Sequence, residues 1–287
     1  MITLNYAAMT DIGQQRANNE DRVWAQSFTT SEGDALGLFI VCDGLGGYLG
    51  GEAASHWAIE AVKKELIPLF TPKDPRATRQ IPIEEIESAL KGIPSPTKPG
   101  RGELDKSIIQ AINQANAVVL QYAAHKVDRA RDAGTTITLA LLWGQTAVIA
   151  NVGDSRTYLL RGNTLRQITR DHSLVATLVA SGQIKPQDVY THPQRNVIFR
   201  SLGHKQKITI DLFHETLKPN DQLLLCSDGL WEMLPDENRI IQLMKEHTDP
   251  NEACRQLIQA ANQAGGVDNI SVIIVKLERI NTQGVQT

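Results

Sequence analysis

Four strand-like segments joined by very short turns constrain the fold of this chain more than any other feature. They cover residues 135–143, 145–152, 155–161 and 164–169, and the turns between them contain Gly144-Gln145, Gly153-Asp154 and Gly162-Asn163. Connections this short permit only antiparallel pairing, because parallel neighbours need a long crossover. The sequence therefore argues against a doubly wound parallel sheet and predicts an antiparallel one.

Amphipathic helical segments lie before and after these strands. Apolar residues recur at helical spacing in 54–69, Trp57 among them, and again in 104–122, so both segments are predicted to turn an apolar stripe toward the core. After the strands, the same spacing occurs in 238–245, and Asp249-Pro250 opens a last helix with an N-cap and a first-turn proline. Helices on both sides of antiparallel strands predict an α+β fold with two stacked antiparallel sheets flanked by helices.

The whole chain, residues 1–287, is expected to form one domain. This length exceeds that of a typical domain, but single domains of this size that combine helices and sheets are ordinary. Residues 71–102 are rich in proline, carry mixed charge and show little periodicity, which indicates a surface insertion.

Charge and apolar content exclude several classes of partner. The net charge is -3 with acids and bases interspersed, which gives no electrostatic footprint for nucleic acid or for an anionic membrane. The first residues lack the pattern of a secretory signal and no apolar run approaches the length of a membrane span, so a cytoplasmic location is expected. The three cysteines cannot all pair, and they are expected to be reduced structural thiols.

Acidic residues stand at the ends of four predicted strands. Asp43 follows the apolar run 36–40 and opens a glycine-rich loop, although an isolated Asp-Gly pair is usually an ordinary turn. The same design recurs at Asp228, at Asp268 and at Glu20-Asp21. Carboxylates gathered in this way repel one another unless divalent cations neutralise them. The bare carbonyl of Gly44 adds another hard oxygen of the kind that Mg²⁺ and Mn²⁺ prefer.

Six short motifs follow one another between Arg16 and Ser271. They are Arg-x-x-Asn-Glu-Asp from position 16, Val-Cys-Asp-Gly-Leu-Gly-Gly from 41, Ala-Gly-Thr-Thr from 133, Val-Gly-Asp-Ser-Arg from 152, Ser-Asp-Gly-Leu-Trp from 227 and Gly-Gly-Val-Asp-Asn-Ile-Ser from 265. In this order, and over nearly the whole chain, they resemble the protein phosphatase type 2C family in its bacterial form. The resemblance implies an α-β-β-α sandwich and Mg- or Mn-dependent hydrolysis of phosphoserine and phosphothreonine in proteins by a metal-activated water.

The resemblance also implies a role for each acidic residue in binding two tightly held Mg²⁺ or Mn²⁺ ions. Asp43 is expected to bridge the two ions, and Asp228 and Asp268 to complete the first site. The second site is expected to use the Gly44 carbonyl together with Glu20 and Asp21, partly through water.

Three further positions are singled out by the same resemblance. Arg16 is expected to be catalytic alongside Asp43, because its planar fork of donors suits phosphoryl oxygens. Asp132 matches the acid that binds a third, weaker ion together with Asp228, but it also ends a run of alternating charges typical of solvated surface. Tyr48 is a departure, because bacterial relatives usually carry there a histidine that has been regarded as the acid for the leaving group.

Two other segments have competing interpretations. Asp154-Ser155-Arg156 could suit catalysis, but a turn followed by an outward-facing arginine explains it as well, and it is assigned to structure. Residues 171–203, which include His172 as a second candidate for the acid, resemble the flap that lies beside the active site of the family and contacts protein substrates. The alternative for this segment is a plain long connection.

Three functions are compared. A monomeric, cytoplasmic signalling phosphatase that acts on phosphorylated proteins and opposes a serine/threonine kinase accounts for all six motifs. The alternative is a catalytically weak phosphoprotein-binding or scaffold protein on the same fold, which is expected to lose metal-binding acids, and none is missing here. A nucleotide-binding loop fails on spacing, because the run 44–49 lacks the last glycine of the dinucleotide motif and the chain has no Gly-Lys-Ser/Thr.

Overall fold

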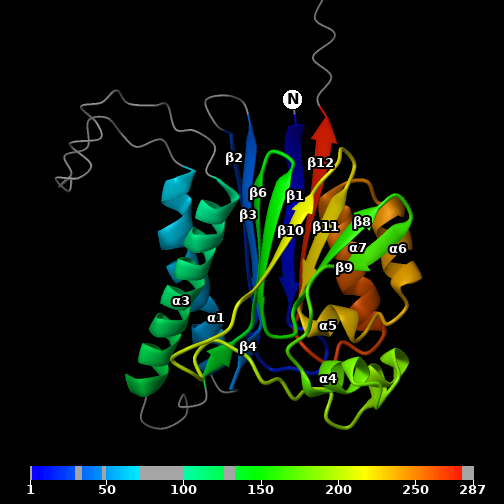
Figure 1. Ribbon diagram of the computed structural model, residues 1–287. Coiled ribbons are helices and arrows are strands. Elements are labelled where there is room, and N and C mark those ends of the chain that lie inside the picture. Colours follow the sequence, from blue (N-terminus) through cyan, green and yellow to red (C-terminus); the bar gives the residue numbers. More distant parts are fainter. Residues whose placement is uncertain (1, 30–33, 47–49, 71–99, 126–132, 280–287) are drawn as a thin grey trace, which may run out of the picture.

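Two five-stranded antiparallel sheets stack face to face, with helices against both outer faces (Figure 1). The computed structural model describes residues 2–29, 34–46, 50–70, 100–125 and 133–279. The predicted α-β-β-α sandwich is confirmed. Most of the predicted insertion, residues 71–99, lies outside the described residues, and the last two predicted insertion residues already belong to a helix.

Each sheet has its strands in a fixed order across the sandwich. In the first sheet the order is β1 (Ile2–Asp11), β12 (Ile270–Arg279), β11 (Gln222–Cys226), β8 (Arg156–Arg161) and β9 (Thr164–Gln167). In the second sheet it is β10 (Asp211–Thr216), β7 (Thr146–Val152), β6 (Ile137–Trp143), β3 (Ala35–Cys42) and β2 (Arg22–Thr29). A short ribbon pairs β4 (Gly44–Leu45) with β5 (Gly134–Thr135) at the lower end of the second sheet in Figure 1.

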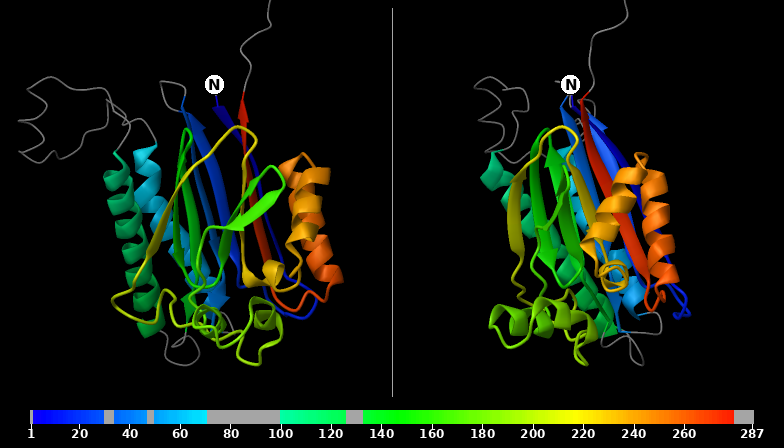
Figure 2. Two further views of the ribbon diagram at one scale, coloured as in Figure 1. Left: turned by 45° about the vertical axis from the view of Figure 1, so that its right-hand side comes forward. Right: turned by 90° about the vertical axis from the view of Figure 1, so that its right-hand side faces the viewer.

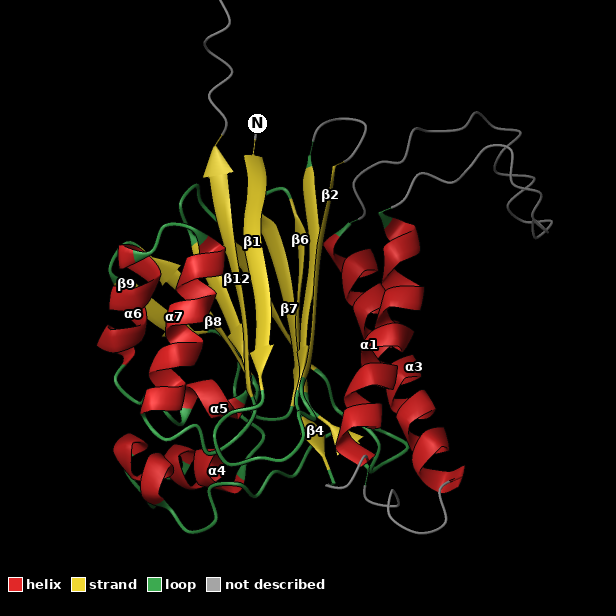
Figure 3. Ribbon diagram, turned by 180° about the vertical axis from the view of Figure 1, so that it is seen from behind, coloured by secondary structure: helices red, strands yellow, loops and turns green. Residues whose placement is uncertain are grey.

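The helices form two pairs on opposite sides of the sheets (Figures 2 and 3). The long helices α1 (Gly50–Leu66) and α3 (Arg101–His125) cover the second sheet, and α6 (Glu237–Glu246) and α7 (Pro250–Gln263) cover the first. The shorter helices are η1 (Ile67–Leu69), α4 (Leu174–Ala180), η2 (Pro186–Thr191) and α5 (Asp228–Trp231). None of the described helices is both long and apolar enough to pass through a bilayer.

Strand β3 shows why its sequence is apolar throughout. Its side chains alternate between two buried layers, because Leu38 and Ile40 pack under the helices while Phe39 and Val41 pack between the sheets. A strand buried on both faces leaves no polar position, so the acid that follows it at position 43 marks the point where the strand reaches the edge of the core.

The structure corrects the predicted meander. Strands β6 and β7 pair antiparallel, as do β8 and β9, but β7 and β8 belong to different sheets. The chain crosses between the sheets at Gly153-Asp154-Ser155, where Gly153 has a φ of 116°. Hydroxyl pairs replace backbone pairing there, because Ser155 bonds Thr136 across the sheets at 2.7 Å. A short turn therefore does not require pairing when the next strand can enter the facing sheet.

Two smaller predictions also need correction. Trp57 was expected to face the core, but it is 44% exposed, because α1 buries Ala54, Ala58, Val62 and Leu66 at a spacing of four and Trp57 lies beside that stripe. Strand β10 was not predicted, since its polar, half-buried sequence carries no clear strand pattern. The predicted buried, unpaired cysteines are confirmed.

Candidate active site

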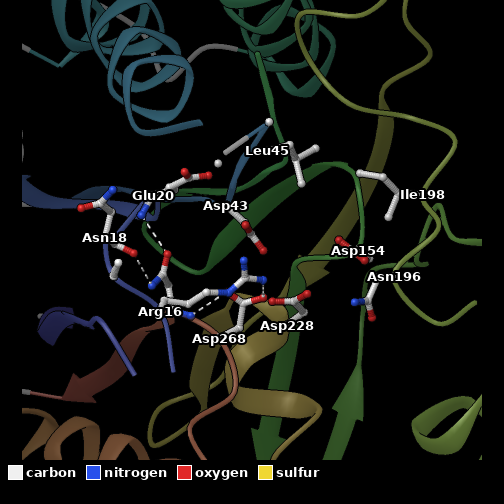
Figure 4. A pocket seen from close by; sticks show the side chains of 14 residues that line it. Arg16, Asn18, Glu20, Asp43, Leu45, Asp154, Asn196, Ile198, Asp228 and Asp268 are labelled. Carbon is white, nitrogen blue, oxygen red and sulfur yellow. Dashed lines mark hydrogen bonds and ion pairs between the residues drawn. The ribbon is translucent and has the colours of Figure 1, made fainter. Parts of the chain in front are cut away.

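The ends of strands from both sheets meet around one cavity of about 400 Å³ (Figure 4). Six of the predicted site residues contribute to its wall from four separate segments: Arg16, Glu20, Asp43, Gly44, Asp228 and Asp268. Asp21 lies behind this wall, where it is fully buried and accepts a hydrogen bond of 2.7 Å from the Ser227 hydroxyl. Asp132 and Tyr48 lie outside the described residues.

The backbone of Asp43 is held by the Ala-Gly-Thr-Thr motif. The Asp43 amide donates to Thr136 Oγ1 at 3.0 Å, and the Asp43 carbonyl accepts from Thr135 Oγ1 at 2.8 Å and from the Thr136 amide at 2.9 Å. At Gly44, a Cβ atom would collide with the carbonyl oxygens of Gly51 and Glu20. Only glycine fits this position, and these contacts fix the point from which the Asp43 carboxylate enters the cavity.

The carboxylates of the site repel one another. Burial raises the pKa of Asp43 well above its usual value, and the charge of Asp228 raises it further. Burial likewise raises the pKa of Asp228, with Asp154 as the next cause, and it raises the pKa of Asp21 to about 7. Asp228 Oδ1 is buried and has no hydrogen-bond partner among the described residues.

This donor set fits divalent cations. Carboxylate and carbonyl oxygens are the ligands that Mg²⁺ and Mn²⁺ prefer, and a cation would neutralise the repulsion and take up the unpartnered oxygen of Asp228. Within the described ranges, no three acidic, histidine or cysteine side chains stand close enough to form a ready-made metal cage. Mutual repulsion between the carboxylates gives a reason why they stand apart. The donor chemistry and the unpartnered oxygen of Asp228 are the observations that indicate a cation site.

Arg16 lies against the acidic wall of the cavity. Its Nη2 donates to Asp268 Oδ2 at 2.5 Å, and this hydrogen bond is the main reason why the pKa of Arg16 is raised (Figure 4). The side chain is about half exposed, so the guanidinium is accessible from solvent. The arrangement places a fixed positive charge beside the acids.

Asp154 is a member of the cavity wall that the sequence interpretation missed. It is 6% exposed and lines the cavity, and burial followed by the charge of Asp171 raises its pKa to about 7. The sequence did contain the signal, because Asp154 follows an apolar strand and a glycine at a strand end, as the other acids of the site adjoin strands.

Arg156 does not face outward, so that part of the prediction is wrong. It is 8% exposed, and it donates from Nε and Nη2 to Asp171, at 3.0 to 3.1 Å and 2.6 Å respectively, and from Nη1 to the Tyr158 hydroxyl at 3.0 Å. Its guanidinium also stacks on Trp231 at 3.6 Å, and the Trp231 ring nitrogen donates to the Asp154 carbonyl at 3.1 Å. Through its contacts with Asp171, Tyr158 and Trp231, Arg156 therefore stabilises the segment where the chain crosses between the sheets.

The segment 171–203 reaches the cavity through Asn196 and Ile198. His172, by contrast, is buried outside the cavity wall, where its Nδ1 accepts from the Gly153 amide at 3.0 Å and its Nε2 lies 3.3 Å from Asp211 Oδ2 and 3.0 Å from Arg200 Nη1. Burial lowers the pKa of His172. With both ring nitrogens occupied, the geometry does not favour His172 as the acid for a leaving group.

The chain is similar in sequence and in fold to known serine/threonine phosphatases. The family described as Protein phosphatase 2C matches residues 13–263. The chain is 36% identical over 270 residues to the serine/threonine phosphatase stp of Listeria welshimeri, with 93% of each sequence covered. The crystal structure of the serine/threonine phosphatase PstP/Ppp of Mycobacterium tuberculosis superposes with a TM-score of 0.76 at 32% identity, covering 97% of this chain and 100% of that one. The catalytic domain of PstP in complex with two manganese ions superposes with a TM-score of 0.74 at 31% identity and the same coverage.

Buried acids and an arginine gathered at the strand ends of a sandwich suit metal-dependent hydrolysis of phosphoric monoesters, and the similar proteins are phosphatases. The chain belongs to the protein phosphatase 2C family. The predicted activity, metal-dependent hydrolysis of phosphoserine and phosphothreonine in proteins, is confirmed, and the scaffold alternative finds no support among the relatives.

Proposed function

We propose that Asp43, Asp228 and Asp268 hold one divalent cation and that Asp43, the Gly44 carbonyl and Glu20, with Asp21 partly through water, hold a second. The observation that carries this proposal is the convergence of these oxygens on one cavity, where burial and neighbouring carboxylates raise the pKa values of Asp43 and Asp228 and Asp228 Oδ1 has no hydrogen-bond partner among the described residues. Bound cations supply charge neutralisation for a phosphate dianion and a nucleophilic water at neutral pH.

The protein's own groups then orient the substrate. Arg16 donates to the phosphoryl oxygens from the wall beside Asp268, which accepts from the same guanidinium and fixes its direction. Thr135 and Thr136 hold the Asp43 backbone so that its carboxylate stays aimed into the cavity. Asp21, one layer behind, is held by Ser227 and supports the acidic wall.

Finer aspects of the function are part of the proposal as well. The chain is proposed to be a single domain and a monomer that opposes a serine/threonine kinase in cytoplasmic signalling. Residues 171–203 are proposed to contact the phosphoprotein as a flap, since Asn196 and Ile198 line the cavity. Either Mg²⁺ or Mn²⁺ suits the oxygen ligands, and a third, weaker ion is proposed for Asp228 with Asp132, which lies outside the described residues.

A panel of peptides carrying phosphoserine, phosphothreonine or phosphotyrosine tests the proposal. With Mn²⁺, phosphoserine and phosphothreonine peptides are expected to release phosphate, and EDTA is expected to stop the release. Arg16→Ala is expected to weaken competitive inhibition by inorganic phosphate. Turnover that survives EDTA would refute the metal site, and an unchanged phosphate affinity in Arg16→Ala would refute the role of Arg16.

A further inference from the structure

Asn269 makes three hydrogen bonds to one distant loop. Its Oδ1 accepts from the Glu20 amide at 2.8 Å, and its Nδ2 donates to the Ile12 carbonyl at 2.9 Å and to the Asn18 carbonyl at 3.0 Å. The residue is 5% exposed and borders the cavity next to Asp268. Both donor hydrogens and one acceptor site of this buried amide are thus used by residues 12–20.

This loop carries both Arg16 and Glu20. Ile12 lies before Arg16, and Asn18 and Glu20 lie after it, so the amide holds the loop on both sides of the arginine. The loop contacts the same segment elsewhere only through backbone and exposed groups, such as the Gln14 amide to the Gly266 carbonyl at 2.7 Å. The backbone amide of Asn269 also donates to Asp268 Oδ1 at 2.8 Å, while Oδ2 of the same carboxylate accepts from Arg16.

We propose that Asn269 is a positioning residue for the phosphatase reaction, which sets Arg16 and Glu20 against Asp43 and Asp268. The inference rests on the proposed roles of Arg16 and Glu20. Without the Asn269 side-chain amide, the loop loses three hydrogen bonds that fix its path. Arg16 and Glu20 are then no longer held in position relative to Asp43 and Asp268. Groups that orient cation ligands or substrate ligands typically change affinity or activity by about 10- to 100-fold when they are removed.

The chain offers a matched control in Asn116 on α3. This residue is 1% exposed, and its amide also makes three bonds to one loop, accepting from the Gly203 amide at 2.9 Å and donating to the Lys205 and Gln206 carbonyls at 2.8 and 3.4 Å. Asn116 does not border the cavity. Its replacement therefore removes the same chemistry from the fold without touching the loop that carries Arg16.

The experiment compares Asn269→Ala with Asn116→Ala in the Mn-loaded enzyme. Both variants are expected to lower the melting temperature, but only Asn269→Ala is expected to raise the Ki of inorganic phosphate and to weaken Mn²⁺ binding measured by calorimetry, each by about 10- to 100-fold. Combined with Arg16→Ala, Asn269→Ala is expected to add little to the change in Ki, because the arginine that it positions is gone. Changes in Ki and in Mn²⁺ affinity that match those of Asn116→Ala within about twofold would overturn the proposal.

Asn269→Asp provides a second variant if the alanine variant does not fold. It keeps the shape and the acceptor for the Glu20 amide, but it turns an oxygen toward the two carbonyls that the Asn269 amide nitrogen now contacts. The same loss of phosphate and Mn²⁺ affinity is expected, and retention of both would overturn the proposal. If Arg16→Ala alone leaves the Ki unchanged, the role of Arg16 fails, and the Mn²⁺ titration of the Asn269 variants then decides whether Glu20 is positioned.

Discussion

Burial of the Asp154 carboxylate is expected to make the stability of the folded protein depend on pH. Among the described residues that line the cavity, Arg16 is the one cation, and it is bonded to Asp268; the charge of Arg156 lowers the pKa of Asp154 but does not offset burial. Its pKa is raised to about 7 by burial and by Asp171, so folding favours its protonated form. Below the ordinary pKa of aspartic acid, Asp154 is protonated in both the folded and the unfolded state and does not lower the free energy of unfolding. As the pH rises from there toward 7, the group ionises more readily in the unfolded state, so the folded state loses stability.

The variant Asp154→Asn tests this argument in EDTA. Asparagine mimics the protonated acid, so the difference in melting temperature between the variant and the parent protein is expected to grow from pH 4 to about 7 and then to level off. A change of about 1 kcal/mol in the free energy of unfolding shifts the melting temperature by about 2 to 4 °C in a domain somewhat smaller than this one. A difference that is constant between pH 4 and 8 would show that Asp154 titrates normally.

The sequence located most of the acidic residues around the cavity but not all of them. Asp43, Asp228 and Asp268 could be found because each adjoins an apolar strand, and strand ends on one side of a sandwich meet in space. Asp154 was missed because its turn was interpreted as a link within one sheet. Asn269 stands in the sixth motif, but its role could not be found, since its bond to Glu20 joins positions 249 apart and depends on the path of an irregular loop.

At the scale of elements, a buried ion pair ties strand β8 to the start of the segment 171–203. Arg156 and Asp171 are both nearly inaccessible, whereas Arg166 and Glu215 join β9 to β10 with the arginine side chain about half exposed. Breaking a buried pair leaves an uncompensated charge, so Arg156→Met is expected to cost about 3 to 5 kcal/mol of unfolding free energy. The matched change Arg166→Met is expected to cost less than about 1 kcal/mol. Equal midpoints in urea for the two variants would contradict this assignment.

Helix α7 is the element that the sequence defined best. Asp249 was predicted as its N-cap, and the Asp249 carboxylate accepts from the Asn251 amide at 3.3 Å, with Pro250 in the first turn. Asp249→Ala is expected to cost about 1 kcal/mol of unfolding free energy, and Asp249→Ser much less because it keeps an acceptor. Phosphatase kinetics are expected to stay unchanged in both, since the cap lies outside the cavity wall. Equal stability of the two variants would show that the cap bond contributes nothing.

For the whole molecule, local signals were sufficient to predict the layers but not their connections. Helical spacing and short turns identified the four longest helices and most of the strands that build the sandwich, but not the edge strands β1 and β10. They could not show that the chain changes sheets between β7 and β8, because that crossing depends on hydroxyl pairs between strands that face each other across the core. The crossing matters for function, since it places Asp154 at the cavity.

The stability of the whole fold is expected to couple to cations in a pH-dependent way. Cations bind ionised carboxylates, while burial and neighbouring carboxylates raise the pKa values of Asp43 and Asp228, so protons compete with the cation increasingly as the pH falls. Mn²⁺ at about 100 times its Kd stabilises a folded protein by about 2.7 kcal/mol when it binds only the folded state. The rise in melting temperature on adding a fixed Mn²⁺ concentration is therefore expected to be larger at pH 8 than at pH 5.5. The variant Asp43→Asn, which removes the proposed bridging ligand, is expected to abolish most of this rise.

Asn116→Ala serves as the control, because it alters the fold away from the cavity and is expected to keep the full Mn²⁺ effect. A Mn²⁺ effect of equal size at both pH values, or one that survives in Asp43→Asn, would mean that the cation binds somewhere other than these carboxylates.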